Sequence, residues 1–271
     1  MTADIATPTD RAIESLLAFW AEAGVEDCLE EQPVNRIIAM APPVRQAPAV
    51  LARAPAAEPP ASPDVAAAIV EARSRAGEAA DLAALEAAIA AFDGCALKFQ
   101  GARRAVFSRG TPQAALMVIG EGPGAEEDQQ GAPFVGRAGK LLDRMLEAAR
   151  LQDRVFITNT VFWRPPGNRT PSPSEQAVCA PFLERAIELI SPKILLLVGG
   201  ASAKSILKKD EGILSLRGRW FEWRSHDSRL VLPALPTLHP AFLLRQPAAK
   251  KKAWADLLTL VERLDRPERH A

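Results

Sequence analysis

Short apolar runs alternate with longer amphipathic stretches from residue 115 towards the C-terminus. Between these runs, apolar residues recur with helical spacing at 139–150, 174–190, 201–209 and about 248–264. The runs have the length and composition of buried strands: ALMVIG (115–120), VFITN (155–159), ILLLVG (194–199) and LVLPALP (230–236). The alternation predicts an α/β fold with three α/β/α layers, in which helices cover both faces of a central, mainly parallel four-stranded sheet.

Unusual residues follow three of the four predicted strands. The segment GEGPG (120–124) follows the first strand, Asn159 closes the second, and Leu238-His239-Pro240 come shortly after the fourth. Parallel sheets bind ligands beyond the carboxyl ends of their strands, so we expect these residues to meet at one edge. GEGPG is neither a Walker A loop nor a GxGxxG fingerprint, and a nucleotide cofactor is therefore not supported.

The N-terminal quarter of the chain has a different pattern. Apolar residues between Thr9 and Val25 share one helical face, whereas residues 41–64 are dominated by Ala and Pro. An Ala-rich helix is predicted from about Pro63 to Ala91. We therefore expect three parts, an N-terminal helical segment (1–40), an Ala/Pro-rich linker (41–64) and a main domain (65–271). The N-terminal helix either docks on the main domain or contacts a partner protein.

Charge is distributed unevenly although the formal net charge is zero. Residues 1–64 hold 4 Lys or Arg against 10 Asp or Glu, which leaves 29 against 23 in residues 65–271. A basic main domain suits a polyanionic partner such as DNA, and scattered surface charge is an equal alternative. The three scattered cysteines form no disulfide framework, and no apolar run is long enough to span a membrane. We expect a cytoplasmic monomer with no membrane partner.

Three sequence blocks carry a family resemblance. They are GEGPGAEEDQQGAPFVGRAGKLL (120–142), ITNTVFWRPPGNRTPSPSE (157–175) and LHPAFLLR (238–245). In this order and spacing they resemble the motifs of the family-four uracil-DNA glycosylases, over about residues 88–263. The resemblance implies a DNA-repair enzyme that flips uracil out of DNA and hydrolyses its N-glycosidic bond, leaving an abasic site for base excision repair. It makes residues 65–271 the glycosylase domain.

The resemblance implies a uracil pocket with four binding residues. Phe134 matches the aromatic residue that stacks on the base, and Asn159 matches the asparagine that reads the base edge. Glu127 matches a residue near uracil C5 that obstructs the methyl group of thymine. Gly122 stands where other branches of the superfamily place an aspartate. The plainer alternatives are a core aromatic for Phe134 and a solvated helix-start residue for Glu127.

Two residues match the family's catalytic positions. His239 matches the histidine that donates to uracil O2, where charge develops as the base leaves. Glu121 matches a glutamate near the attacking water, and it acts as a base, orients the water or supports the loop. The following segment resembles the loop that wedges apolar side chains into DNA and contacts phosphate, which makes these residues DNA-binding candidates: Phe242, Leu243, Leu244 and Arg245.

The chain departs from the family at its iron-sulphur cluster. The four positions of the family's cysteine ligands read Phe92, Cys95, Trp163 and Cys179. Two thiolates cannot hold a four-iron cluster in the usual way. We therefore expect no metal and no cluster, with an apolar plug around Phe92 and Trp163 in its place.

Three alternative functions remain open at this stage. A non-catalytic protein that binds uracil-containing or single-stranded DNA would keep the pocket without cleaving. A glycosylase with a broader range would also accept other deaminated bases. The related branch that is trapped covalently on its DNA uses a histidine in an added loop, and the corresponding stretch here, residues 164–169, reads RPPGNR without one.

Overall fold

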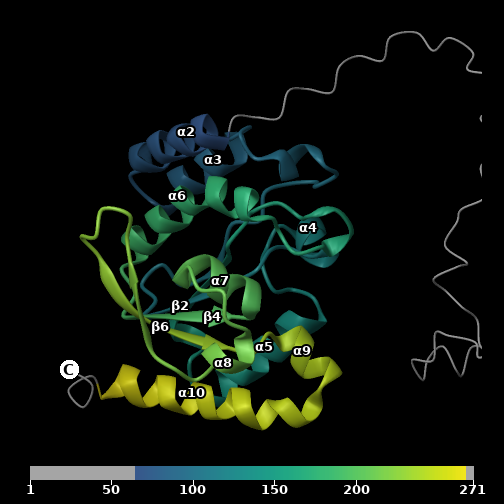
Figure 1. Cartoon of the computed structure of the whole chain (residues 1–271), viewed down its shortest axis with the longest axis vertical. Coiled ribbons are helices and arrows are strands. Elements are labelled where there is room, and N and C mark those ends of the chain that lie inside the picture. Colours follow the sequence, from purple (N-terminus) through teal and green to yellow (C-terminus); the bar gives the residue numbers. More distant parts are fainter. Residues whose placement is uncertain (1–64, 267–271) are drawn as a thin grey trace, which may run out of the picture. The chain divides into compact units, whose positions relative to one another are not determined.

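The computed structural model describes residues 65–266, in which a six-stranded sheet lies between two layers of helices (Figure 1). The strand order is β1-β3-β2-β4-β6-β5. The predicted helix between Thr9 and Val25 and the Ala/Pro-rich linker lie outside the described residues. The description that follows concerns residues 65–266 alone.

The four predicted strands form the parallel centre of the sheet, which confirms the predicted fold class. They are β2 (Leu116–Gly120), β3 (Val155–Asn159), β4 (Ile194–Val198) and β6 (Val231–Thr237). Two antiparallel edge strands complete the sheet, β1 (Arg109–Gly110) beside β3 and β5 (Phe221–Arg224) beside β6. The sequence pattern missed both, because β1 is too short to show a period and β5 is largely accessible to solvent.

Helices cover both faces of the sheet. Successive residues of a strand point to opposite faces, so each strand contributes side chains to two core clusters. In β2, Met117 and Ile119 pack into one core cluster with α2 (Val65–Glu78), α3 (Leu82–Ala91) and α6 (Pro173–Ile190). Leu116 and Val118 pack into a second cluster, with α5 (Arg137–Ala148) and α10 (Lys250–Asp265). Figure 1 shows these helices on opposite sides of the strands. None of the helices within residues 65–266 has the length and apolarity to cross a membrane.

Shorter helices connect these elements at the ends of the strands. The α-helical ones are α4 (Ala125–Gln130), α7 (Gly200–Leu207), α8 (Ile213–Leu216) and α9 (Pro240–Arg245). The 3₁₀ turns are η1 (Ala96–Phe99), η2 (Gln152–Arg154), η3 (Pro166–Asn168) and η4 (Pro247–Ala249). The helices α4 and α9 begin shortly after β2 and β6, so the unusual residues at these strand ends lie at helix starts.

The prediction of one Ala-rich helix from about Pro63 to Ala91 is wrong, because α2 and α3 are separate helices. The Asp81 carboxylate starts α3 by accepting a hydrogen bond from the backbone N–H of Ala84 at 2.8 Å. The guanidinium of Arg185, on α6, donates to the carbonyl oxygen of Ala79 at 2.9 and 3.1 Å. This tertiary contact satisfies a backbone group that a continuous helix would satisfy internally.

The strand register brings the sequence blocks together at one edge of the sheet. In the β2–β3 pair, Gly120 lies opposite Asn159, and in the β4–β6 pair Val198 lies opposite Thr237. His239 follows Thr237 by two residues. The residues that follow β2, β3 and β6 therefore lie at one edge of the sheet, as predicted.

Candidate active site

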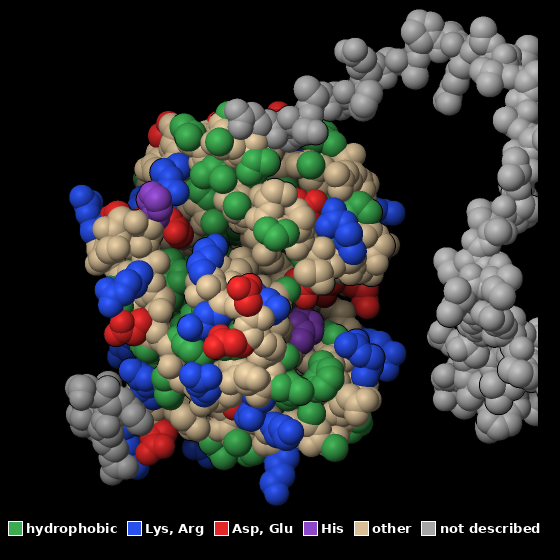
Figure 2. All heavy atoms as spheres, viewed as in Figure 1, with side chains coloured by type: hydrophobic (Ala, Val, Ile, Leu, Met, Phe, Trp, Pro, Cys, Tyr) green, Lys and Arg blue, Asp and Glu red, His purple; other side chains and the backbone are tan. Residues whose placement is uncertain are grey.

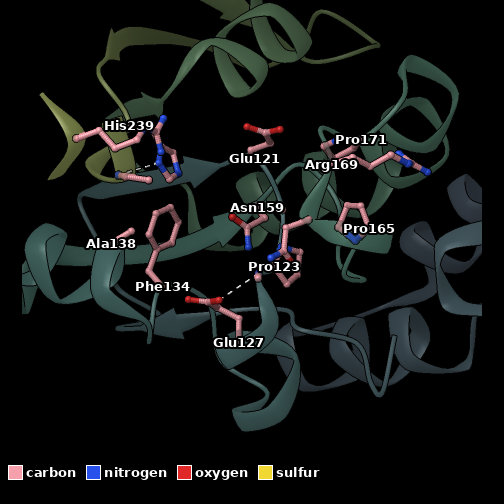
Figure 3. Close-up of a pocket in the computed structure, with 15 residues that line it drawn as sticks. Glu121, Pro123, Glu127, Phe134, Ala138, Asn159, Pro165, Arg169, Pro171 and His239 are labelled. Atoms are coloured by element: carbon pink, nitrogen blue, oxygen red, sulfur yellow. Dashed lines mark hydrogen bonds between the residues drawn. The ribbon is translucent and has the colours of Figure 1, made fainter. Parts of the chain in front are cut away.

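A cavity of about 420 Å³ opens at this edge of the sheet (Figure 3). Its wall includes seven residues that the sequence predicted as site residues: Glu121, Gly122, Glu127, Phe134, Asn159, His239 and Arg245. They come from the segment between β2 and α5, which includes α4, from the end of β3, and from α9 with its N-cap. The cavity is thus built by the three sequence blocks together.

Asn159 lies at the bottom of the cavity, between the other labelled side chains (Figure 3). Its side chain is buried, and its Oδ1 has no hydrogen-bond partner within residues 65–266. Gly120 makes room for it, since a Cβ at that position would lie 2.4 Å from Oδ1 and 2.5 Å from the Phe134 ring. A buried unpaired acceptor costs free energy, so this oxygen is suited to a donor on a bound ligand.

Phe134 forms one wall of the cavity and also belongs to the core cluster of α5 and α10. It is only 6% exposed. Its backbone φ is 55°, in the left-handed region that residues other than glycine rarely adopt. Phe134 is therefore a core aromatic, as the plainer alternative had it, and the same residue also lines the cavity.

Glu127 is both a helix-start residue and a cavity residue. Its carboxylate accepts hydrogen bonds from the backbone N–H groups of Gly124 at 3.1 Å, Val135 at 3.0 Å and Gly136 at 3.0 Å. The first bond caps α4, and the other two tie the segment that follows Phe134 to the same carboxylate. Glu127 therefore holds two walls of the cavity together rather than standing free in solvent.

His239 is the N-cap of α9, and its Nδ1 accepts a hydrogen bond from the backbone N–H of Ala241 at 3.2 Å. Burial lowers the pKa of the imidazole to about 4, and the positive charge of Arg245 acts in the same direction, against the opposing effect of Glu127. The ring is therefore neutral near pH 7. With Nδ1 accepting, the proton of the neutral ring is on Nε2, which is left as a donor.

Glu121 follows β2 directly, and its side chain lines the cavity, drawn between those of His239 and Arg169 in Figure 3. The Thr160 hydroxyl fixes its backbone by donating to the Glu121 carbonyl oxygen at 2.6 Å. At Gly122, a Cβ would lie 2.9 Å from Cγ2 of Val161. An aspartate here would displace its neighbour, which gives a steric reason for the glycine.

The four predicted DNA-binding residues lie on α9 in unlike environments. Leu244 and Arg245 are exposed and Phe242 is half-buried. Leu243 is fully buried and packs with Leu238 in a small core cluster. This placement argues against a DNA contact for Leu243, because a helix presents only one face to its surroundings and this residue lies on the inner one.

A proline-rich loop between β3 and α6 forms a further wall, and sequence reasoning gave it no role. Pro165, Arg169 and Pro171 line the cavity. The Arg169 guanidinium donates to both oxygens of Glu175 at 2.9 and 2.7 Å, and it lowers the pKa of that carboxyl. Glu175 also accepts from the backbone N–H of Ser172 in a capping box. The S-x-x-E pattern of Ser172 to Glu175 is typical of a helix start, and it was the signal in the sequence from which this capping box could have been predicted.

The positions that the resemblance assigns to an iron-sulphur cluster do not fit one. Phe92 and Trp163 are fully buried, and Phe92 packs edge-on against Phe182 with ring centroids 5.2 Å apart. The sulphur atoms of Cys95 and Cys179 are 3.9 Å apart, in direct contact. Their contact and burial raise the pKa of Cys179 well above its usual range, and the same contact lowers the pKa of Cys95, so these two thiols are the candidates that the described residues offer for a cluster that uses four. Residues 65–266 contain no group of three or more side chains suited to a metal.

Comparison with known proteins decides the family. The sequence model of the uracil-DNA glycosylase superfamily matches residues 107–258, more than half of the chain. The chain belongs to the uracil-DNA glycosylase superfamily. The matched range contains the cavity residues from Glu121 to Arg245.

Three similar proteins are each a Type-4 uracil-DNA glycosylase. The chain is 40% identical to the Sulfurisphaera tokodaii protein over 61% of this chain and 77% of the relative. It is 40% identical to the Thermotoga maritima protein over 52% and 71%, and 37% identical to the Pyrobaculum aerophilum protein over 65% and 91%. The similarity thus spans most of each relative and more than half of this superfamily member.

Charges of both signs are interspersed over the face of this superfamily member that Figure 2 shows. Lys and Arg side chains do not gather there in one continuous patch. Basic side chains on this face therefore stand singly, and Arg245 is a basic residue that lines the cavity.

Proposed function

We propose that this protein is a DNA-repair glycosylase that flips uracil out of DNA and hydrolyses its N-glycosidic bond. The observation that carries the proposal is the buried, unpaired Oδ1 of Asn159 at the cavity. Uracil presents a donor at N3 and an acceptor at O4, so the single amide accepts from one and donates to the other. Cytosine presents the opposite pattern and leaves both partners unpaired, which penalises its binding.

The neighbouring side chains would recognise the faces and edges of the same base. Phe134 would stack on one face of uracil, an interaction worth about 1–3 kcal/mol. Glu127 would stand near C5 and obstruct the methyl group of thymine, in agreement with its place on the cavity wall. Its three backbone hydrogen bonds keep it from moving aside, which supports a role in exclusion.

His239 would stabilise the leaving base. Uracil departs as an anion, and its O2 gains charge only as the glycosidic bond breaks. A neutral imidazole with its proton on Nε2 donates a hydrogen bond to that oxygen without giving up a proton in the ground state. The hydrogen bond from Ala241 to Nδ1 and the low pKa of His239 support this role, because together they keep the ring neutral in this tautomer.

Glu121 would serve the other reactant, the water that attacks the sugar. The sugar gains cationic character as uracil leaves, and a carboxylate beside it would stabilise that charge and orient a water. The fixed carbonyl of Glu121 and its place on the cavity wall support this assignment. We assign it to water positioning, and the loop after β2 carries it.

Two exposed residues on α9 are proposed as the main DNA contacts. Leu244 would fill the gap that the flipped nucleotide leaves in the base stack. Arg245 would contact a phosphate, and its position on the cavity wall supports a contact close to the reacting nucleotide. Phe242 is half-buried, so it offers less surface to DNA than Leu244 does.

We further propose that residues 65–271 form the whole catalytic domain and act without an iron-sulphur cluster. The described residues of this range lie in one compact unit. Phe92 and Trp163 supply packing where the family has ligands, which supports a structure that is independent of iron. The reaction is proposed to be monofunctional and to leave an intact strand with an abasic site.

The test is a strand-cleavage assay on a labelled single-stranded oligonucleotide with one uracil. We expect full-length product on direct electrophoresis and a break at the uracil after alkali, because only the base is removed. Thymine or cytosine at the same position should give no break. A break without alkali would contradict a monofunctional reaction, and retention of uracil-DNA with no break after alkali would make this a binding protein. Oligonucleotides with hypoxanthine or xanthine measure the substrate range.

A further inference from the structure

The backbone of Phe134 is held in a conformation that the residue does not prefer. At φ 55° the Cβ of an L-residue crowds its own backbone, so the conformation persists only where neighbours impose it. The ring leaves the backbone in a direction that φ and ψ set. Whatever holds the backbone of Phe134 therefore also sets the wall of the cavity.

Arg109, on the edge strand β1, holds the two carbonyl groups of this turn. Its Nε donates to the carbonyl oxygen of Pro133 at 2.7 Å, and its Nη2 donates to that of Phe134 at 3.2 Å. The same Nη2 pairs with the carboxylate of Asp143 at 2.6 Å. The planar fork of a guanidinium suits three such partners at once. The Nε and Nη2 groups of Arg109 are thus both engaged by acceptors within the protein.

Helix α5 holds the same turn from the opposite side. A Cβ on Gly139 would lie 1.7 Å from the carbonyl oxygen of Phe134, so this carbonyl rests directly on the first turns of the helix. Asp143 follows Gly139 by one helical turn and orients Arg109 from the same helix. The carbonyl is thus enclosed between α5 and the guanidinium, while Glu127 holds the N–H groups that follow it.

Arg109 is itself fixed relative to the strand that carries Asn159. Its partner in the β1–β3 pair is Ile157, two residues before Asn159. Gly110 permits this close pairing, since its φ is 110° and a Cβ there would lie 2.2 Å from the carbonyl oxygen of Val155. Arg109 therefore links the strand that reads the base edge to the turn that carries the stacking ring.

We propose that Arg109 is a positioning residue for base recognition, which acts by holding Phe134 in place to stack on uracil. The inference rests on the proposed function. It predicts that loss of the guanidinium weakens the binding of the base and leaves the bond-breaking step nearly unchanged, because His239 and Glu121 lie on other elements.

The test measures KM and kcat for a single-stranded uracil oligonucleotide, together with inhibition by free uracil, in wild type and Arg109→Ala. Free uracil is neutral, so its binding excludes any effect of phosphate attraction. We expect uracil inhibition to weaken and KM to rise by about five- to tenfold, part of what a stacking contact contributes, while kcat changes by less than about twofold. Arg109→Lys keeps the charge but not the fork, and it should not restore wild-type binding.

Two further variants separate positioning from stability. Arg154→Ala removes another arginine ion pair, that of Arg154 with Asp265 at 2.9 Å, whose members do not line the cavity, and it should leave KM and uracil inhibition unchanged. In the background Phe134→Ala, removal of Arg109 should weaken uracil binding no further.

The outcomes distinguish this inference from the function on which it rests. Equal uracil inhibition of wild type and Arg109→Ala would overturn the inference and leave the glycosylase function intact. The inference would also be overturned if Arg109→Ala weakened uracil binding equally with and without the Phe134 ring, because the arginine would then act independently of that ring. A wild-type protein that neither cleaves nor binds uracil would overturn the proposed function itself.

Discussion

The ring of Phe134 lies 5.8 Å from the ring of His239, and their planes are inclined by 31°. One ring comes from the turn before α5, and the other comes from the N-cap of α9. Both rings and the amide of Asn159 line the same cavity. The arrangement therefore offers one surface for the face of a base and two polar groups for its edge.

Asn159→Ala should impair recognition of uracil. It removes both hydrogen bonds to the base edge and should lower kcat/KM by about ten- to a hundredfold, since each buried bond contributes about 0.5–1.5 kcal/mol and an unpaired ligand group costs more. Gln152→Ala, which truncates an exposed amide in the turn before β3, serves as the matched control. An Asn159→Ala enzyme with wild-type kcat/KM would contradict the role of the unpaired oxygen.

The ionisation of His239 can be followed directly by NMR of its ring protons, assigned with the variant His239→Gln. Burial and then the charge of Arg245 lower its pKa to about 4, so Arg245→Gln should raise the pKa. The unfolded chain takes up this proton near pH 6.5, and the folded protein does not. The contribution of His239 to stability is therefore complete above about pH 6.5 and is lost as the pH falls towards about 4. A midpoint near pH 6.5 in the folded protein would contradict a neutral buried ring.

The absence of the iron-sulphur cluster remains a prediction, which iron analysis and visible absorbance of the purified protein can test. Trp163→Ala should open a cavity in its place and lower the free energy of unfolding by about 3–5 kcal/mol. Trp254, which is 37% exposed, provides the control, and Trp254→Ala should cost much less. Stoichiometric iron in the wild-type protein would show that Cys95 and Cys179 are supplemented by other ligands.

Acid should loosen the proline-rich wall of the cavity. The Arg169 guanidinium lowers the pKa of Glu175, so the ionised carboxyl stabilises the fold above its usual pKa, and this stability is lost as the pH falls through the lowered value. Glu175→Gln should lower Tm at pH 7, and the difference from wild type should shrink between about pH 5 and about pH 3. A difference in Tm that is independent of pH would argue against a contribution from this charge.

The sequence was sufficient for the parallel centre of the sheet and for most of the cavity wall. Apolar runs identify buried strands because burial on both faces requires them, and parallel strands bring their carboxyl ends to one edge. Asn159 and His239 could be placed at that edge on this basis. The family resemblance then assigned their chemistry.

Long-range contacts could not be predicted in the same way. Strand β1 has two residues, too few to show a period, and the partners of Arg109 on Pro133, Phe134 and Asp143 depend on the folded chain. Leu243 belongs to a sequence block that resembles a DNA-binding loop, yet the helical turn of α9 directs it into the core. Motif membership fixed the segment, and only tertiary packing fixed which of its side chains are exposed.

The central claim is tested most directly by wild-type and His239→Ala protein on the same uracil-containing oligonucleotide, with alkali treatment and a denaturing gel. The account predicts alkali-dependent breaks at uracil with the wild type and a rate that is about 10²- to 10³-fold lower with the variant, because one donor to the developing anion is lost. Both proteins should bind the oligonucleotide with similar affinity. Equal cleavage by the two proteins, or no cleavage by the wild type, would contradict the account.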